Sequence, residues 1–165
     1  MTPHQITLVQ TSFASVRPQA DTAAELFYRR LFELDPSLRR LFPNDIREQG
    51  RKLMAMLGYV IAGLHRPETI MTAMQELGRR HVDYGVQEAS YATVGTALLW
   101  TLRQALGAQF TPAVETAWIT AYTLLADTMK SAAASEQQSD QALSSATAPN
   151  ALDASHAFPI APRTA

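Results

Sequence analysis

The chain has 165 residues, a formal net charge of −1 and no cysteine, and 47% of its residues are hydrophobic. This length and composition are those of one ordinary globular domain with room for a short tail. The lack of cysteine excludes a disulfide framework and a thiolate zinc site. The basic residues are scattered and form no electrostatic footprint for nucleic acid, so we expect no nucleic-acid partner.

The N-terminal segment, MTPHQITLVQTSFASV, lacks the basic start and long apolar run of a leader peptide. No stretch reaches the roughly 18 continuous apolar residues that a membrane-spanning helix needs. We therefore expect a cytoplasmic protein that does not associate with a membrane.

Apolar residues recur at helical spacing along most of the chain rather than alternating as they do in strands. This pattern predicts a first helix over about residues 3–17 and a second helix that ends before Pro36. Pro36 can itself open a short helix through Leu41. A third helix covers 53–64, where the apolar residues fall on one face: Leu53, Leu57, Val60, Ile61 and Leu64.

Three further helices are predicted in the second half of the chain. One begins after Pro67, and the next covers about 91–106 and ends at Gly107, where a left-handed cap is usual. The last begins at Thr111 and Pro112, a cap and first-turn pair, and ends near residue 132. Because no segment is a convincing strand, the predicted class is all-α, with six to seven helices around one core.

The composition changes at about residue 134. From there the chain reads ASEQQSDQALSSATAPNALDASHAFPIAPRTA, which is rich in Ala, Ser, Gln and Pro. Few large apolar residues remain to order such a segment. The sequence therefore predicts a domain over residues 1–133 and a disordered, low-complexity tail over 134–165.

Three polar residues fall on faces that are otherwise apolar. His81 continues the apolar stripe of the fourth helix, but an inward histidine by itself is more often a hydrogen-bonded core residue than a ligand. Gln49 extends the stripe of the third helix backwards by one turn, and Tyr28 can bring a hydroxyl inward from the second helix. Alone, each would most often be a capping, surface or core residue. Together they indicate a pocket in which one metal ligand faces two hydrogen-bond donors.

Four segments occur in order and at compatible spacing: FYRRLFELDPSLRRLF (27–42), EQGRKL (48–53), RRHVDYG (79–85) and SYATVGTALL (90–99). On these segments the chain resembles the globins, in particular single-domain bacterial haemoglobins and the haem domain of flavohaemoglobins. The resemblance covers about residues 3–132. It implies the globin fold, built around a pocket for haem b (iron protoporphyrin IX).

The resemblance also implies roles for individual residues. It makes His81 the proximal ligand of the haem iron and places the Phe42 ring against the porphyrin. Tyr28, Gln49 and Leu53 would then form the pocket for the gaseous ligand.

On the proximal side, Tyr91 matches a tyrosine that supports the histidine in flavohaemoglobins. Ala133 stands where those proteins carry a glutamate, which weakens any inference of peroxidase-like tuning. Arg80 and Lys52 could pair with haem propionates, although a solvated helix face explains each of them equally well.

The chemistry of such a pocket can be stated from the side chains. A hydroxyl or amide that donates to a ligand carrying partial negative charge makes a hydrogen bond worth about 1.5–3 kcal/mol. Each donor could slow the loss of O2 roughly tenfold or more. Gln49 is not a strong iron ligand, so we expect five-coordinate ferrous iron before gas binds. We also expect His81 to donate its second ring N–H to a carbonyl near Leu77, which fixes the tautomer.

These expectations favour reversible binding of O2, and of NO or CO, for oxygen storage or delivery. The alternative is an enzyme that converts nitric oxide to nitrate. The chain carries no glycine-rich dinucleotide motif, so such turnover would need a separate reductase. Gas sensing ranks lower, because the tail carries no recognisable output domain, and a haem-free helical bundle is a further alternative. The sequence does not indicate an oligomeric state.

Overall fold

The computed structural model describes residues 1–43 and 45–146, which form six α-helices and three short 3-10 helices and include no strand. The α-helices are α1 (Pro3–Val16), α2 (Ala20–Leu34), α3 (Ile46–Gly63), α4 (Pro67–Asp83), α5 (Glu88–Leu106) and α6 (Pro112–Ala146). The 3-10 helices are η1 (Arg17–Gln19), η2 (Pro36–Leu41) and η3 (Gly107–Gln109). The prediction of an all-α fold with six to seven helices is confirmed.

Local signals set several of the helix boundaries. Thr2 opens α1 with a capping box, and Asp35 and Asp45 cap η2 and α3 through their carboxylates. The predicted cap before α6 is present, since the Thr111 hydroxyl accepts from the N–H of Val114 at 3.4 Å. Gly107 follows α5 with φ +52°, as expected of a glycine, but its ψ of −123° lies outside the left-handed helical region.

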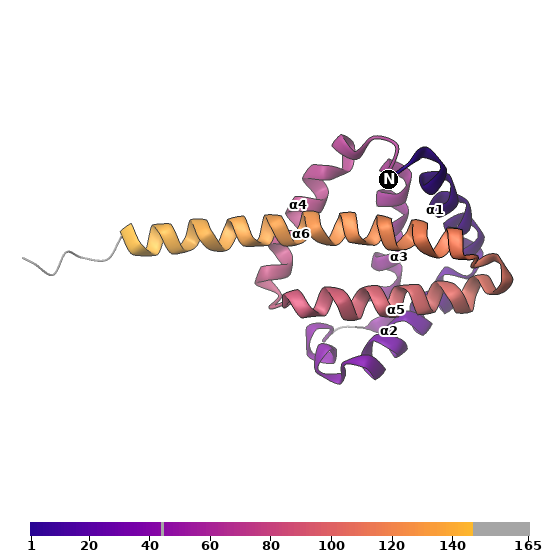
Figure 1. Ribbon diagram of the computed structural model, residues 1–165. Helices are drawn as coiled ribbons and strands as arrows, with labels where there is room; N and C mark the ends of the chain where they lie inside the picture. Colours follow the sequence, from indigo (N-terminus) through magenta and orange to yellow (C-terminus); the bar gives the residue numbers. More distant parts are fainter. Residues whose placement is uncertain (44, 147–165) are drawn as a thin grey trace, which may run out of the picture.

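The helices pack around one main core, and Tyr91, Ala126 and Met129 form a second, smaller cluster. The longest helix is α6 (Figure 1). It runs antiparallel to α5 and packs on α1 and, most extensively, on α4. The α4 and α6 backbones approach so closely that a Cβ on Gly78 would lie 2.4 Å from the carbonyl oxygen of Met129, so only glycine fits there. By contrast, α3 and α4 make few contacts with each other. These are the two helices that carry Gln49 and His81.

The last helix is longer than the sequence predicts. It continues past residue 132 to Ala146 and projects from the rest of the molecule (Figure 1). No glycine or proline follows Pro112 within α6, and its second half is rich in alanine, the strongest helix former. An ion pair between Arg79 Nε and Glu136 Oε2 (3.4 Å) connects this part of α6 to α4. Residues 134–146 are therefore helical rather than disordered, and the rest of the predicted tail, 147–165, lies outside the described residues.

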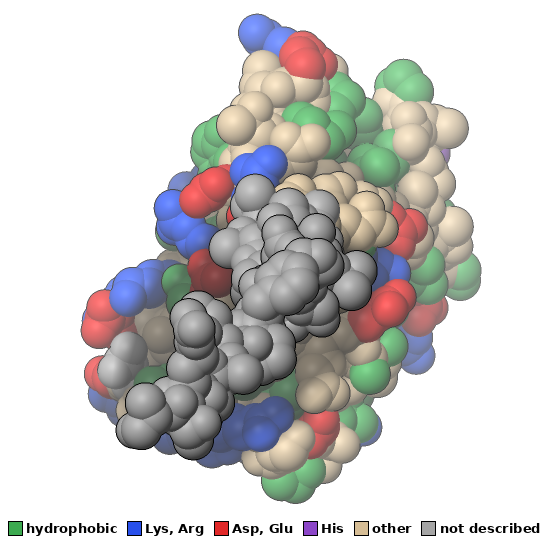
Figure 2. Space-filling model, turned by 90° about the vertical axis from the view of Figure 1, so that its left-hand side faces the viewer, with side chains coloured by type: hydrophobic (Ala, Val, Ile, Leu, Met, Phe, Trp, Pro, Cys, Tyr) green, Lys and Arg blue, Asp and Glu red, His purple; other side chains and the backbone are tan. Residues whose placement is uncertain are grey.

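Two further features concern the surface. No helix in the part of the chain that the structure describes is long and apolar enough to cross a membrane. Figure 2 shows the side of the molecule from which α6 projects. On the uncovered part of that face, acidic and basic side chains are interspersed.

Candidate functional site

His81 lies in the last turn of α4, which ends in a tight glycine turn. Gly85 has φ +75°, a left-handed conformation that glycine adopts without steric cost. The turn lets the N–H of Val86 donate to the carbonyl of His81 and the N–H of Gly85 donate to that of Val82, both at 2.9 Å. This Schellman arrangement ends α4 at Asp83, two residues after His81, and fixes the backbone from which the imidazole projects.

A hydrogen bond orients the His81 ring. Its Nδ1 lies 2.7 Å from the carbonyl oxygen of Leu77, which can only accept, so Nδ1 carries the proton. The predicted bond to Leu77 is confirmed, and Nε2 keeps a free lone pair. Burial lowers the pKa of His81, although the bond to Leu77 partly opposes this effect. The imidazole is therefore neutral at neutral pH, which is the form that ligates a metal.

Tyr91 supports the His81 ring from α5. The two rings are stacked, with centroids 6.0 Å apart and an interplanar angle of 25°. Tyr91 is 9% exposed, and its buried hydroxyl has no hydrogen-bond partner among the described residues. Of its neighbours on α6, Ala126 and Met129 have no polar side chain, and the Tyr122 hydroxyl donates to the backbone carbonyl of Tyr91. Burial also raises the pKa of Tyr91, so its hydroxyl is neutral and adds no negative charge beside His81.

We expect Tyr91→Phe to leave the free energy of unfolding unchanged or higher, because the hydroxyl it removes is buried and unpaired. Tyr122→Phe is the matched comparison. The Tyr122 hydroxyl donates to the carbonyl of Tyr91 at 2.6 Å, and its removal should cost about 1 kcal/mol. Urea denaturation of the full chain, followed by circular dichroism, measures both. Equal losses in the two variants would show that the Tyr91 hydroxyl has a partner.

Tyr28 lies on α2 within a cluster of aromatic rings. It meets Phe27 and Phe42 edge to face, with centroids 5.1 and 5.2 Å away, and Phe32 at 6.0 Å. The residue is 4% exposed, and within residues 1–43 and 45–146 its hydroxyl makes no hydrogen bond. Burial raises the pKa of Tyr28 to about 12. The hydroxyl is therefore protonated at neutral pH and free to donate.

Gln49 and Leu53 lie one turn apart on α3, and both are half-buried. The side-chain amide of Gln49 has no hydrogen-bond partner in the part of the chain that is described, whereas its backbone N–H donates to the carbonyl of Asp45 at 3.0 Å. Leu53 packs against the core that contains Tyr28, and so does Phe42. The structure thus places Tyr28 and Phe42 in direct contact. Leu53 packs against the core that contains Tyr28, and Gln49 lies one turn before Leu53 on α3.

Several apolar residues of these elements are only half-buried although most of them lie on inward-facing stripes: Phe42, Leu53, Leu77, Val86 and Val94. Apolar side chains with incomplete cover are typical of a pocket for a largely apolar ligand. The sequence interpretation did not assign Phe32 or Val86 to the site. Their signals are present, however: Phe32 lies one turn after Tyr28, and Val86 directly follows the turn glycine.

These residues fit a haem. The neutral imidazole of His81 presents a free Nε2 for an iron atom, and the half-covered apolar side chains suit the faces of a macrocycle. The hydroxyl of Tyr28 and the amide of Gln49, which have no partner among the described residues, are hydrogen-bond donors that a ligand of such an iron could use. The donor set therefore matches a metal macrocycle with one protein ligand.

Arg80, the remaining predicted site residue, is exposed. Its Nε lies 3.2 Å from Glu76 Oε1, one turn back on α4. Lys52 has a similar partner, with its Nζ 2.8 Å from Glu48 Oε1 on α3. Such exposed pairs contribute little to stability, and they fit the alternative of a solvated helix face. The role of Arg80 towards a propionate stays a prediction.

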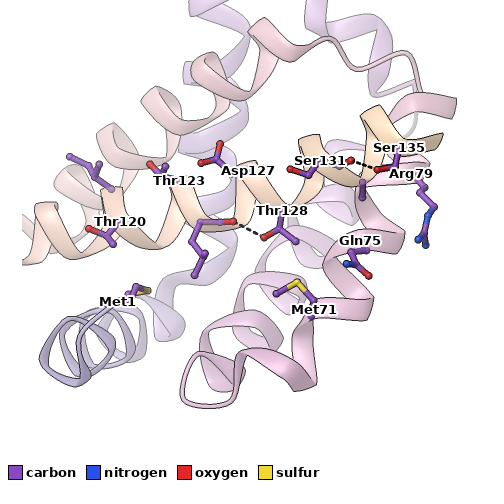
Figure 3. A pocket seen from close by; sticks show the side chains of 13 residues that line it. Met1, Met71, Gln75, Arg79, Thr120, Thr123, Asp127, Thr128, Ser131 and Ser135 are labelled. Carbon is purple, nitrogen blue, oxygen red and sulfur yellow. Dashed lines mark hydrogen bonds between the residues drawn. The ribbon is translucent and has the colours of Figure 1, made fainter. Parts of the chain in front are cut away.

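A cavity of about 840 Å³ opens elsewhere, between the N-terminus, α4 and α6 (Figure 3). None of the predicted site residues lines it. Its α4 residues, which include Met71 and Gln75, lie on a different face of the helix from His81. On α6, the hydroxyls of Thr128 and Ser135 donate to carbonyls of their own helix at 2.8 and 3.0 Å. This hollow is therefore separate from the site built around His81.

Comparison with known proteins identifies relatives that match most of this chain. The Globin family model matches residues 25–129. A flavohaemoprotein of Xylella fastidiosa (strain Temecula1) is 32% identical over 131 residues, which cover 78% of this chain and 33% of that protein. Neuroglobin of Danio rerio is 29% identical over 136 residues, covering 74% of this chain and 86% of that protein. The chain thus spans about a third of the length of the flavohaemoproteins that it matches first.

One solved structure is similar over nearly its whole length. It is described as an engineered carbene transferase and candidate nitric oxide dioxygenase from Rhodothermus marinus. The two structures share a TM-score of 0.76 and 25% sequence identity, and the match covers 87% of this chain and 99% of that one.

Proposed function

This chain belongs to the globin family, and from that premise we propose that it holds haem b through His81 and reversibly binds O2, or NO and CO, at a five-coordinate iron for oxygen storage or delivery. Membership of the family implies a haem cofactor. When bound, the haem supplies the iron atom that takes the gas. The observation that carries the proposal is the His81 imidazole, whose Nδ1 is engaged by Leu77 and whose Nε2 is free.

On the distal side, the task of the protein is to present hydrogen-bond donors. The Tyr28 hydroxyl stays protonated, because burial raises its pKa to about 12. Its ring is held by Phe27 and Phe42, so the hydroxyl is oriented before a ligand arrives. The amide of Gln49 is a second donor, on α3. Hydrogen bonds to a ligand that gains negative charge favour retention of O2 over a less polar gas.

On the proximal side, the protein orients the ligating imidazole without charging it. The Leu77 carbonyl holds the Nδ1 proton, and the stacked ring of Tyr91 limits rotation of the His81 ring. A neutral carbonyl withdraws the Nδ1 proton less than a carboxylate would, so His81 remains an ordinary neutral ligand. This environment supports reversible binding better than chemistry that needs a strongly electron-donating histidine.

The second candidate function is nitric oxide dioxygenation. It is favoured by the structural relative from Rhodothermus marinus and by the flavohaemoproteins, which this chain matches over about a third of their length. Repeated turnover consumes electrons, and they would come from a reductase acting in trans. The distal donors Tyr28 and Gln49 serve either function, so they do not distinguish the two.

Nitric oxide consumption by the O2-loaded protein separates the candidates. For a storage or delivery protein, we expect consumption to stop at the amount of protein present, with or without an added flavin reductase and NADH. Sustained consumption that depends on a reductase would overturn storage in favour of the enzyme. The absorption spectrum of the ferrous protein without gas tests the coordination, and a six-coordinate spectrum would contradict the five-coordinate iron proposed above.

A further inference from the structure

A second, smaller cavity lies where the start of α5 meets η2 and the turn after α4. Its volume is about 80 Å³, several times the roughly 10–15 Å³ that one water molecule needs. Neither His81, Tyr28 nor Gln49 lines it. The cavity is therefore distinct from the proposed haem site.

The N-terminal end of α5 forms one wall. This helix has 19 residues, and its N-cap residue, Gln87, makes no side-chain capping hydrogen bond. The backbone N–H of Ser90 donates to the carbonyl of Gln87 at 2.9 Å, so among the described residues the N–H groups of Glu88 and Ala89 are the ones at this end that have no partner. They carry the positive end of the helix dipole. Gln87 and Ala89 both line the cavity. The helix start thus offers unsatisfied donors to whatever fills the space.

The Ser90 side chain is a second feature of the cavity that is available to a ligand. The residue is 8% exposed and lines the cavity, yet across the described residues its hydroxyl makes no hydrogen bond. Ser12, inside α1, donates to the Leu8 carbonyl of the preceding turn at 2.7 Å, whereas Ser90 stands in the first turn of α5, which has no helical turn before it. Since Ser90 makes no such bond, its hydroxyl is available to a group in the cavity.

The charged side chains around the cavity decide which kind of group fits. Arg40, on η2, lines it and forms no ion pair within the described part of the chain. Asp35 is the acidic residue of the lining, and its Oδ1 already accepts from the backbone N–H of Ser37 at 3.0 Å and from its hydroxyl at 2.6 Å. Glu88, in the first turn of α5, is a second acidic residue near the cavity but does not line it. The lining itself therefore offers more donors, from Arg40, the start of α5 and Ser90, than free acceptors.

We propose that this cavity binds a small oxyanion of the size of phosphate or nitrate. The backbone N–H groups of Glu88 and Ala89 and the hydroxyl of Ser90 donate to its oxygens, and the Arg40 guanidinium balances its charge. Asp35 opposes binding through its negative charge and so limits the affinity.

The test is a titration of the haem-loaded full chain, with CO bound, by potassium phosphate and in a separate series by potassium nitrate. Ionic strength is kept constant with potassium chloride, because such contacts are screened by salt. The backbone amide resonances of Ala89 and Ser90 follow the binding. We expect saturable shifts, and the two series show which oxyanion is preferred.

Single substitutions show whether the residues around this cavity hold the anion. Arg40→Gln and Ser90→Ala should each weaken binding, Arg40→Gln by roughly tenfold or more. Arg17→Gln is the matched control, since Arg17 is also exposed and lies just before Gln19, which bonds to the other end of α5 at the carbonyl of Ala105. Asp35→Asn keeps a side chain that can cap η2 and removes the opposing charge, so it should tighten binding.

Three results would overturn the proposal. The first is the absence of saturable shifts with both ions. The second is equal affinity in Arg40→Gln and Arg17→Gln, which would show that the contact is not at this cavity. The third is weaker binding in Asp35→Asn, which would indicate a cation site. The CO spectrum of the same samples reports on the haem pocket, so failure of this proposal and failure of the proposed function are distinguishable.

Discussion

Replacing His81 with alanine is expected to abolish stable haem binding by the full chain. The imidazole is the group that presents a free nitrogen, Nε2, from a ring held by Leu77 and stacked on Tyr91. Loss of an outer partner of a metal ligand lowers metal affinity about 10–100-fold, and loss of the ligand itself should cost more. Haem titration, followed by the absorption band of the bound cofactor, measures the change.

His4→Ala is the control for the loss of a histidine, because His4 is exposed on α1. It should bind haem as the unchanged chain does. Free imidazole added to the His81→Ala protein can enter the vacated position, and we expect it to restore part of the haem binding. Circular dichroism of the variant checks that the helices are retained. Unchanged haem binding by folded His81→Ala protein would contradict the ligand assignment.

The second large effect is expected on the distal side. Tyr28→Phe should raise the rate of O2 dissociation roughly tenfold or more, because it removes one donor to the bound ligand. The phenylalanine ring keeps the contacts with Phe27 and Phe42, and no hydrogen bond within the described residues is lost. Stability should therefore change little. Stopped-flow displacement of O2 by CO measures the rate.

Gln49→Leu tests the other donor in the same way, and the double variant shows whether the two donors act on the ligand together. Tyr59→Phe is the matched control, since Tyr59 also lies on a helix but is 54% exposed, with its hydroxyl bonded to the Thr69 carbonyl at 3.3 Å. It should leave the rate unchanged. If neither Tyr28→Phe nor Gln49→Leu speeds dissociation, the proposed distal pocket is wrong.

Much of the proximal geometry could be predicted from the sequence because it is local. The acceptor of the His81 N–H is the carbonyl four residues earlier, a distance that the helix itself sets. That the Tyr91 hydroxyl has no partner among the described residues could not be predicted in this way. It depends on which α6 residues pack against Tyr91, and these include Tyr122, Ala126 and Met129, more than thirty positions away in the chain.

The sequence by itself determined the helices and the identity of the polar residues on their inward faces, because helical periodicity, caps and turn glycines act over a few residues. The same local reasoning underestimated α6, whose alanine-rich continuation is a good helix former despite its lack of large apolar residues.

Only the tertiary structure decided which of these side chains keep unused hydrogen-bonding groups. Tyr28, Tyr91 and Ser90 are all nine-tenths buried or more, and none has a partner for its hydroxyl in the described residues. Burial and pairing arise from contacts between helices that are distant in the chain, and a one-dimensional pattern does not contain them. The proposed gas pocket and the proposed anion site both depend on that information.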